Sequence, residues 1–233
     1  MPSLQTNTVF HGDCMQVMHQ FPANSIDGII TDPPYGIDYH ATRRKDKARW
    51  FPKIANDRAP FIWWLSEAAR ILKPDGALLC FTRFDTEEAF RFAIRLAGLQ
   101  PKTQIIWDKG VHGVGDCLGD VGLRHENIIF ATKGRFRFPG GRPVSVVRVP
   151  RLSSPKLTHP NEKPVELLKH LVEAVTKPGD LVLDPFLGSG TTAVAAKLTG
   201  RRYIGVELDR GYALAARSRL AALGSNPTKV RQS

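Results

Sequence analysis

The stretch LVLDPFLGSGTTA, residues 181–193, decides the fold, because it reads as a buried strand, a glycine-containing turn and the opening of a helix. Glycine allows the backbone to approach a ligand closely. Gly188, Gly190 and Ala193 also match the G-x-G-x-x-[GA] spacing of dinucleotide-binding folds. The stretch therefore predicts a nucleotide-type ligand site at the end of a strand.

The same alternation of strand and helix extends along the chain, where short runs rich in Val, Ile and Leu are separated by helical stretches. This pattern is typical of an α/β fold in which a largely parallel, seven-stranded sheet is covered by helices on both faces. The strands are expected at residues 8–11, 26–31, 77–81, 102–107, 126–131, 181–183 and 203–206. The helices are expected at residues 61–72, 86–97, 164–176, 191–198 and 210–223. We expect one domain, residues 1–233.

Two long stretches, residues 37–56 and 133–158, do not read as regular elements. Loops of this length in a compact domain are usually lids or binding loops, so we expect them to face a substrate. The chain carries 33 Lys and Arg against 22 Asp and Glu, a net charge of +11. This excess favours a polyanionic partner, although a basic surface without any nucleic-acid role remains the alternative.

The remaining composition points to a protein of the cytoplasm. No apolar run approaches the roughly 20 residues that a membrane span requires, and the first ten residues lack the features of a signal peptide. The three cysteines, Cys14, Cys80 and Cys117, are widely spaced and form no CxxC pair. We therefore expect reduced thiols and no metal site.

Two acidic residues flank the glycine turn and bear on the ligand. Glu207 lies at the end of the next strand, where a carboxylate can accept hydrogen bonds from both hydroxyls of a ribose. Asp184 comes just before the turn, where it would repel a diphosphate but attract the positively charged amino-acid moiety of S-adenosylmethionine. The pair favours the methyl donor over a nicotinamide cofactor.

The run IITDPPYG, residues 29–36, is the second decisive stretch. An apolar strand delivers Asp32 to the edge of the sheet, and Pro33 and Pro34 then stiffen the backbone, so that the carboxylate and the Pro33 carbonyl point to one place. Two acceptors on the hydrogens of an aromatic amine favour a localised lone pair that can attack a methyl group. Tyr35 offers a flat face on which an extruded base can stack.

Together, the DPPY run at 32–35 and the DPFLGSG run at 184–190 resemble the catalytic and cofactor motifs of the DNA amino-methyltransferases. The DPPY run comes first, which resembles the beta class of adenine-N6 and cytosine-N4 enzymes. The resemblance implies a Rossmann-like methyltransferase fold with a circularly permuted motif order, with both motifs on adjacent central strands. It also implies S-adenosyl-L-methionine as cofactor, double-stranded DNA as substrate and a homodimer, because family members are often dimers.

Further segments resemble family motifs around the donor. In HPNEKP, residues 159–164, Asn161 and Lys163 would contact the methionine end, and in HGDC, residues 11–14, Asp13 would accept from the adenine amine. His125–Glu126 resembles a motif near the active site, for which core and catalytic roles both stay open. The expected cofactor contacts are Asp13, Cys14, Asn161, Lys163, Pro164, Asp184, Phe186, Gly188, Ser189, Gly190, Thr191, Glu207 and Leu208.

The target base is indicated only by the resemblance. Members that act on adenine tend to carry an acid at the first motif position, as Asp32 does, which favours adenine N6 over the alternative, cytosine N4. Clustered cations near aromatic residues suit phosphate contact and base stacking. The expected DNA contacts are Arg43, Arg44, Lys45 and Lys47 in the first loop, and Arg135, Arg137 and Arg142 in the second.

Two other classes of function remain open on the sequence alone. The glycine turn followed by Glu207 would also suit a nicotinamide-dependent oxidoreductase. The net charge and the two basic loops would also suit a nucleic-acid-binding protein without catalysis.

Overall fold

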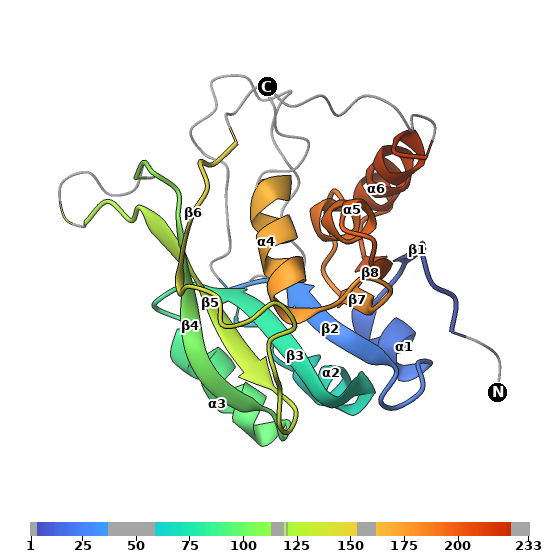
Figure 1. The fold of residues 1–233 in the computed structure, drawn as a ribbon, viewed down its shortest axis with the longest axis horizontal. Helices are drawn as coiled ribbons and strands as arrows, with labels where there is room; N and C mark the ends of the chain where they lie inside the picture. The colour runs from blue at the N-terminus through green and yellow to red at the C-terminus, as the bar shows by residue number, and fades with distance from the viewer. Residues whose placement is uncertain (1–3, 37–58, 113–118, 120, 153–161, 225–233) are drawn as a thin grey trace.

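The computed structural model describes residues 4–36, 59–112, 119, 121–152 and 162–224, and its elements surround one eight-stranded sheet (Figure 1). The strand order is β1-β8-β7-β2-β3-β5-β4-β6. The strands are β1 Thr8–His11, β2 Ile26–Thr31, β3 Leu72–Thr82, β4 Gln100–Asp108, β5 His125–Thr132, β6 Val146–Arg148, β7 Leu181–Asp184 and β8 Arg202–Glu207. β5 is antiparallel to both of its neighbours, whereas the other strand pairs are parallel.

All seven predicted strands are present, and an eighth, β6, was not predicted. β6 is a three-residue edge strand inside the stretch that reads as a loop, and so short a run carries no recognisable period. β2 and β7 pair directly at the centre of the sheet. The carboxyl ends of these two strands, which carry the DPPY and DPFLGSG runs, therefore meet at one edge, which we call the carboxyl edge.

Three helices cover each face of the sheet (Figure 1). One face carries α1 Cys14–His19, α2 Leu65–Ile71 and α3 Glu87–Leu96, and the other carries α4 Val165–Val175, α5 Thr191–Leu198 and α6 Arg210–Ala222. The predicted start of α2 at residue 61 is wrong, because the helix begins at Leu65. The Phe61 N–H donates to the Pro34 carbonyl (3.2 Å), and the Phe61 carbonyl accepts from the Trp64 indole N–H (2.9 Å) rather than from a helical N–H. α6 lies beside β1, since the Arg217 guanidinium donates to the Val9 carbonyl (2.7 Å).

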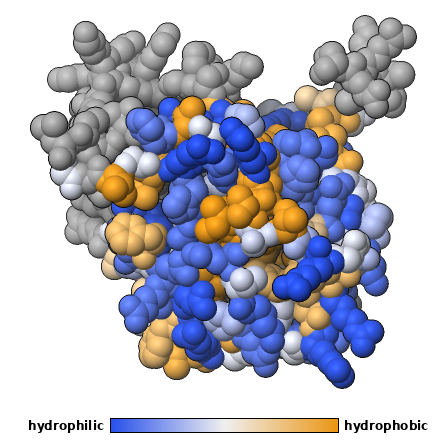
Figure 2. All heavy atoms as spheres, turned by 60° about the vertical axis from the view of Figure 1, so that its left-hand side comes forward, coloured by the Kyte–Doolittle hydropathy of each residue, from blue (hydrophilic) through white to orange (hydrophobic). Residues whose placement is uncertain are grey.

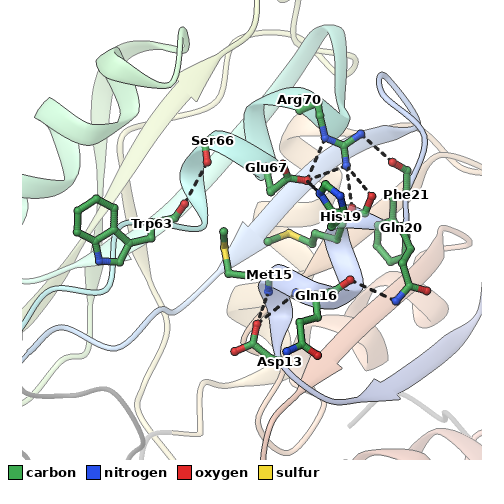
Figure 3. Close-up of polar contacts among 11 residues, drawn as sticks. Asp13, Met15, Gln16, His19, Gln20, Phe21, Trp63, Ser66, Glu67 and Arg70 are labelled. Carbon is green, nitrogen blue, oxygen red and sulfur yellow. Dashed lines mark hydrogen bonds and ion pairs between the residues drawn. The ribbon is translucent and has the colours of Figure 1, made fainter.

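Helix α1 is the helix that sequence reasoning missed, and Figure 3 shows what stabilises it. At its start, Asp13 Oδ1 accepts from the N–H groups of Met15 (2.8 Å) and Gln16 (3.2 Å), as an N-cap does. At its end, the Arg70 guanidinium of α2 donates to the carbonyls of Met18 (2.9 Å) and Phe21 (2.8 Å). A six-residue helix is marginal alone, so tertiary bonds at both ends explain why its sequence carries little signal.

The stretch after β5, from Lys133 onward, covers the outer strands on the face that carries α4, where no helix lies among the described residues. Phe136 and Phe138 pack against Phe130 of β5, with ring centroids 5.5 and 5.2 Å away, while the arginines between and beside them face solvent. Further on, the Trp107 indole N–H donates to the Val149 carbonyl (2.7 Å) and fastens the end of the stretch to β4. The stretch therefore crosses the sheet face beside α4 and returns to the carboxyl edge through β6 (Figure 1).

The surface on the side of β6 is mixed in character. Figure 2 shows apolar side chains there, ringed by hydrophilic ones. Val144 and Val146, which lie before and within the edge strand, are 73% and 55% exposed. Among the described residues, the helices are too short or too polar to cross a membrane.

Candidate active site

The DPPY turn follows β2 at the carboxyl edge and is held from several sides. The Tyr35 hydroxyl donates to Asp32 Oδ1. Burial, aided by the negative charges of Asp32 and Glu126, raises the pKa of Tyr35 well above its usual value, so this hydroxyl stays a donor. Gly36 closes the turn at φ +82°, and a Cβ there would lie less than 3 Å from the backbone of residues 59–60. The turn is therefore fixed and tolerates only glycine at its end.

The DPFLGSG turn follows β7 and leads into α5. The Leu187 N–H donates to the Val206 carbonyl of β8 (2.9 Å), which curls the turn back over the sheet. Gly190 has a φ of +93°, and a Cβ on it would lie 2.9 Å from the Ala216 Cβ of α6. Glycine thus serves the left-handed turn and the close approach of two helices at the same position.

A direct hydrogen bond joins the two turns. Thr31 Oγ1, at the end of β2, donates to Asp184 Oδ1 at the end of β7 (2.7 Å), and the Phe186 N–H donates to the same oxygen (3.1 Å). Burial raises the pKa of Asp184 to about 6, although hydrogen bonds from Thr192, Thr31 and the Phe186 N–H act to lower it. The two motifs found in sequence are therefore one site in space.

Glu207 and Asp13 flank the glycine turn. The two oxygens of Glu207 accept from the N–H groups of Gly188 (2.7 Å) and Asp209 (2.8 Å), which ties the turn to the end of β8. Each carboxylate oxygen has a second lone pair, so Glu207 can still accept from a ligand. Asp13 uses Oδ1 to cap α1, which leaves Oδ2 as the atom that could face one. Leu208, just after Glu207, is 47% exposed and offers an apolar surface.

Lys163 lies between the DPPY turn, which we also call the reaction turn, and the start of β5. Its ammonium nitrogen is 2.6 Å from Asp32 Oδ2 and 3.0 Å from Glu126 Oε2, and it lies 5.0 Å above the Phe81 ring. Glu126 Oε1 in turn lies 3.5 Å from Lys109. Four charges of alternating sign, on four separate segments, therefore form a chain that starts at Asp32.

These charges are largely buried, and each is paired. Burial acts to lower the pKa of Lys163, but Asp32 and Glu126 outweigh it and raise that pKa. Burial likewise acts to raise the pKa of Glu126, but Lys163 and Lys109 outweigh it and lower that pKa. Both groups are therefore charged at neutral pH.

The residue before Lys163 anchors this segment to the glycine turn. Glu162 Oε1 lies 2.7 Å from the Arg219 guanidinium of α6. Arg219 also donates to the Ser189 carbonyl (3.4 Å) and to the Thr191 hydroxyl (3.3 Å). Lys163 is thereby held beside both turns, although its ammonium group is directed at Asp32 rather than at the glycine turn.

The other residues predicted for the site lie in the core, at the start of α4 or outside the described part of the chain. The Cys14 side chain is buried in the core, where burial and the Asp13 carboxylate raise its pKa to about 12, so a ligand could meet only its backbone. Phe186 packs on Phe61 and Trp64, and Pro164 is the N-cap of α4. Five predicted residues lie outside the described part of the chain: Arg43, Arg44, Lys45, Lys47 and Asn161.

Arg135 lies away from the two turns of the site. The Arg135 N–H donates to Asp75 Oδ1 near the start of β3 (2.6 Å), and β5 ends just before, at the amino edge of the sheet. At about 3.3 Å per strand residue, this edge is about 20 Å from Asp32. Arg137 and Arg142 follow on the exposed side of the stretch that crosses the sheet. Arg148, at the end of β6, pairs with Asp108 at the end of β4 and so lies at the carboxyl edge.

Sequence reasoning assigned no role to Lys109 or Arg219 and left that of Glu126 open. Their signal was weak, because a single charged residue at a strand end is usually a solvated one. Lys109 and Glu126 lie at the boundaries of β4 and β5 on the carboxyl edge, which only the pairing of the strands brings next to Asp32.

Comparison with known proteins identifies the family of the chain. A family model described as DNA methylase, of the N6/N4 methyltransferase type, matches residues 26–218. A putative methylase of Escherichia coli K12, YubD, is 37% identical over 216 residues and covers 91% of this chain and 89% of its own length. The Type II methyltransferase M.HinfI of Haemophilus influenzae is 26% identical over 96% of this chain and 71% of its own length.

Comparison with solved structures identifies the fold. A DNA modification methylase of Thermus thermophilus, described as putative, has a TM-score of 0.69 and 28% identity, covering 92% of this chain and 94% of its own. The cytosine-N4-specific PvuII methyltransferase has a TM-score of 0.68 at 18% identity, covering 99% and 89%, and so shares the fold. The fold is thus the Rossmann-like methyltransferase fold, and the chain belongs to the N6/N4 DNA methylase family, with its DPPY turn ahead of its glycine turn.

Proposed function

We propose that this DNA methyltransferase transfers a methyl group from S-adenosyl-L-methionine to the N6 amine of adenine in double-stranded DNA, with Asp32, Pro33, Pro34 and Tyr35 as its reaction centre. The hydrogen bond from Thr31 to Asp184 carries the proposal, because it joins the DPPY turn to the glycine turn. An amine bound at one turn would then lie next to a donor bound at the other.

The groups around the glycine turn suit this donor. Glu207 can accept from the ribose hydroxyls, Asp13 from the adenine amine, and Leu208 offers an apolar face to the ring. Asp184 provides a negative charge near the positive amino-acid moiety. A Thermus thermophilus relative, 26% identical, has been solved with S-adenosyl-L-methionine bound. We propose the remaining contacts at Phe186, Gly188, Ser189, Gly190, Thr191, Asn161, Lys163 and Pro164, with only the backbone of Cys14 taking part.

The reaction turn acts on the amine. When bound, S-adenosyl-L-methionine supplies a methyl group made electrophilic by the sulfonium. Asp32 accepts one hydrogen of the amine and the Pro33 carbonyl accepts the other, which localises the nitrogen lone pair. The Tyr35 ring supports the flipped base, while its hydroxyl keeps the Asp32 carboxylate oriented. The chain thus contributes orientation and charge, and it needs no covalent intermediate.

The choice of adenine rests on the acid at the first motif position, Asp32, which family members acting on adenine tend to carry. Cytosine N4 is the alternative, since a structural neighbour specific for cytosine N4 shares the fold. Both amines are planar and delocalised, so the same turn could orient either.

The rest of the proposal concerns context. We propose that residues 1–233 form a single methyltransferase domain that works in the cytoplasm, forms a homodimer and meets DNA through residues 37–56 and 133–158. Within these segments the cations Arg43, Arg44, Lys45, Lys47, Arg137, Arg142 and Arg148 would contact the backbone of DNA. The protein's relatives M.HinfI and M.BglII are Type II methyltransferases. We therefore also propose that this protein works alongside a restriction enzyme.

The test is the identity of the modified nucleoside. Unmethylated DNA is incubated with the protein and donor labelled in its methyl group, and the DNA is then digested and analysed by mass spectrometry. We expect labelled N6-methyladenine. Labelled N4-methylcytosine would establish the alternative base, whereas unlabelled nucleosides across varied DNA would refute the proposed reaction.

The reaction centre is tested with Asp32→Asn, which keeps the size of the side chain but removes its charge. We expect a loss of at least about 100-fold in the rate of transfer by the folded protein. The melting temperature should fall as well, because the buried Lys163 ammonium loses one of its paired charges. Asp180→Asn is the matched control, because Asp180 lies at the amino edge and its amide oxygen can still accept from the Lys177 N–H. A fully active Asp32→Asn protein would exclude the assigned mechanism.

A further inference from the structure

Fold stability alone does not explain the chain of buried charges that starts at Asp32. Lys163 is 11% exposed and lies over Phe81, and Glu126 is 26% exposed. Burying an ion pair costs so much desolvation energy that well-packed apolar residues would stabilise a fold equally well. The members of the cluster come from the turn after β2, from the segment before α4, and from the ends of β5 and β4 at the carboxyl edge. Charge at this place therefore points to chemistry rather than to packing.

The proposed reaction moves a positive charge onto the amine. The amine nitrogen forms a bond to the methyl carbon while the carbon–sulfur bond breaks and leaves its electron pair on sulfur. The nitrogen is then cationic until one of its protons passes to the Asp32 carboxylate and on to water. A negative charge facing the nitrogen stabilises this change, and a positive charge opposes it.

Without Glu126, Lys163 would weaken the stabilisation that the Asp32 charge gives to the cationic nitrogen. An ammonium group 2.6 Å from the Asp32 carboxylate orients it well but cancels most of its charge. Glu126, 3.0 Å from the same ammonium, cancels the charge of Lys163 in turn and leaves that of Asp32 to act on the substrate. Lys109 balances Glu126 from the far side.

We propose that Glu126 is a positioning residue of the methyl transfer, which acts through Lys163 to orient the Asp32 carboxylate and to preserve its negative charge. The inference rests on the proposed function of Asp32. In addition to the donor contact proposed for Lys163, it gives this residue a role at the reaction turn, and it gives Glu126 a role in the rate of transfer.

The groups that face Asp32 limit how its charge can respond to pH. They are Tyr35, Cys80, Lys163 and, through Lys163, Glu126, together with Asp184 across the Thr31 bond. Burial, followed by the charge of Asp32, raises the pKa of Cys80 well above its usual value. Burial also raises the pKa of Tyr35, so neither group gains charge between about pH 5 and 9. The charges that count in this range are those of the carboxylates and Lys163.

The first readout is independent of catalysis. Acid titration of the Asp32 carboxyl, followed by ¹³C NMR, is compared in the wild-type protein, Glu126→Gln and Lys163→Met. We expect the titration to move to lower pH in Glu126→Gln, because Lys163 then acts on Asp32 alone. It should move to higher pH in Lys163→Met, because two carboxylates then face each other. Identical titrations in Glu126→Gln and the wild type would overturn the proposal.

The second readout is the rate of single-turnover methyl transfer at saturating DNA and donor. We expect Glu126→Gln to lower this rate about 10- to 100-fold while donor affinity stays within about twofold. Glu126→Asp should recover part of the rate, since it restores the charge. The double variant Glu126→Gln/Lys163→Met should be faster than Lys163→Met, because it relieves the repulsion between carboxylates. Losses that multiply in the double variant would indicate two independent structural roles and reject the proposal.

Lys73→Met is the matched control. Lys73 forms a 2.7 Å ion pair with Asp27, so the variant removes the same type of charge, but this pair lies near the start of β3 at the amino edge. We expect the titration curve and transfer rate of this variant to match the wild type. If the wild type transfers no methyl group to any DNA, the proposed function fails, whereas the titration still decides whether Glu126 acts on Asp32 through Lys163.

Discussion

Thr31 shows how a single hydroxyl couples the two motifs. Its Oγ1 lies 2.7 Å from a carboxylate that is 4% exposed and whose pKa is raised to about 6 by burial. A raised pKa means that the folded protein binds this proton more tightly than the unfolded chain does. The stability that Asp184 contributes is therefore present below about pH 4 and falls as the pH rises from about 4 to 6. The Thr31 hydroxyl limits this fall, because it favours the charged form.

We therefore predict that Thr31→Val costs more stability at pH 8 than at pH 5. A hydrogen bond to a charged group contributes about 2 kcal/mol, and one to a neutral group about 1 kcal/mol. Urea unfolding at the two pH values measures the difference. Thr31→Ser, which keeps the hydroxyl, should lose the same small amount at both. An equal loss for Thr31→Val at pH 5 and pH 8 would show that Asp184 keeps one protonation state over this range.

At the scale of residues, the sequence was most informative where the backbone itself is constrained. The prolines after Asp32 and the glycines at 188 and 190 predict two turns, and the structure places both turns at the carboxyl edge of the sheet. Lys163 was found through a resemblance, but its direction could not be predicted. A lysine side chain has a flexible four-carbon stem, and only the packing of β5 against β3 and β4 brings Glu126 within its reach.

At the scale of elements, Lys133 illustrates how the end of one helix depends on a distant strand. Its ammonium nitrogen lies 2.7 Å from the carbonyls of Ala69 and Leu72 at the end of α2, and 2.8 Å from Asn24 Oδ1. Burial lowers the pKa of Lys133, yet these three acceptors take the place of water. A single side chain after β5 thus closes α2 and fixes the approach to β2.

We predict that Lys133→Met lowers the free energy of unfolding by about 2 kcal/mol, because it leaves helix-end carbonyls without a charged donor. The rate of methyl transfer in the folded protein should be unchanged, since these contacts lie at the amino edge. Denaturant unfolding and an activity measurement at low temperature test the two parts. Lys102→Met, at an exposed lysine bonded to Gln100, should change neither quantity. A loss of activity without a loss of stability would contradict the prediction.

The elements that sequence reasoning missed share a physical cause. α1 has six residues and β6 has three, and each is stabilised by partners far away in the chain: Arg70 for α1 and Trp107 for the end of the stretch that contains β6. Local period and propensity cannot reveal an element whose stability is tertiary. The central strands β2 and β7 were found because nearly all of their residues are buried and both faces are largely apolar.

At the scale of the whole molecule, the net charge of +11 becomes informative only once the cations are placed. Asp108 at the end of β4 faces two guanidinium groups. Arg124 engages both of its oxygens at 2.7 Å, and this pairing is the main cause that holds the pKa of Asp108 below its usual range. Arg148 approaches it only to 3.9 Å and has a side chain that is 71% exposed. Its charge is therefore available at the carboxyl edge, close to the reaction turn, whereas Arg135 lies at the amino edge.

We predict that Arg148→Ala weakens DNA binding and lowers the slope of log affinity against log salt by about 1, because one phosphate contact and its released counterion are lost. Arg135→Ala removes the same charge from the exposed surface and keeps the backbone bond to Asp75, so it should leave affinity and slope unchanged. Fluorescence anisotropy with labelled duplex DNA between about 50 and 200 mM salt measures both slopes. If the two variants lose the same slope, DNA is attracted by the overall charge of the molecule. If only Arg148→Ala changes it, DNA meets the edge at which the two motif turns converge.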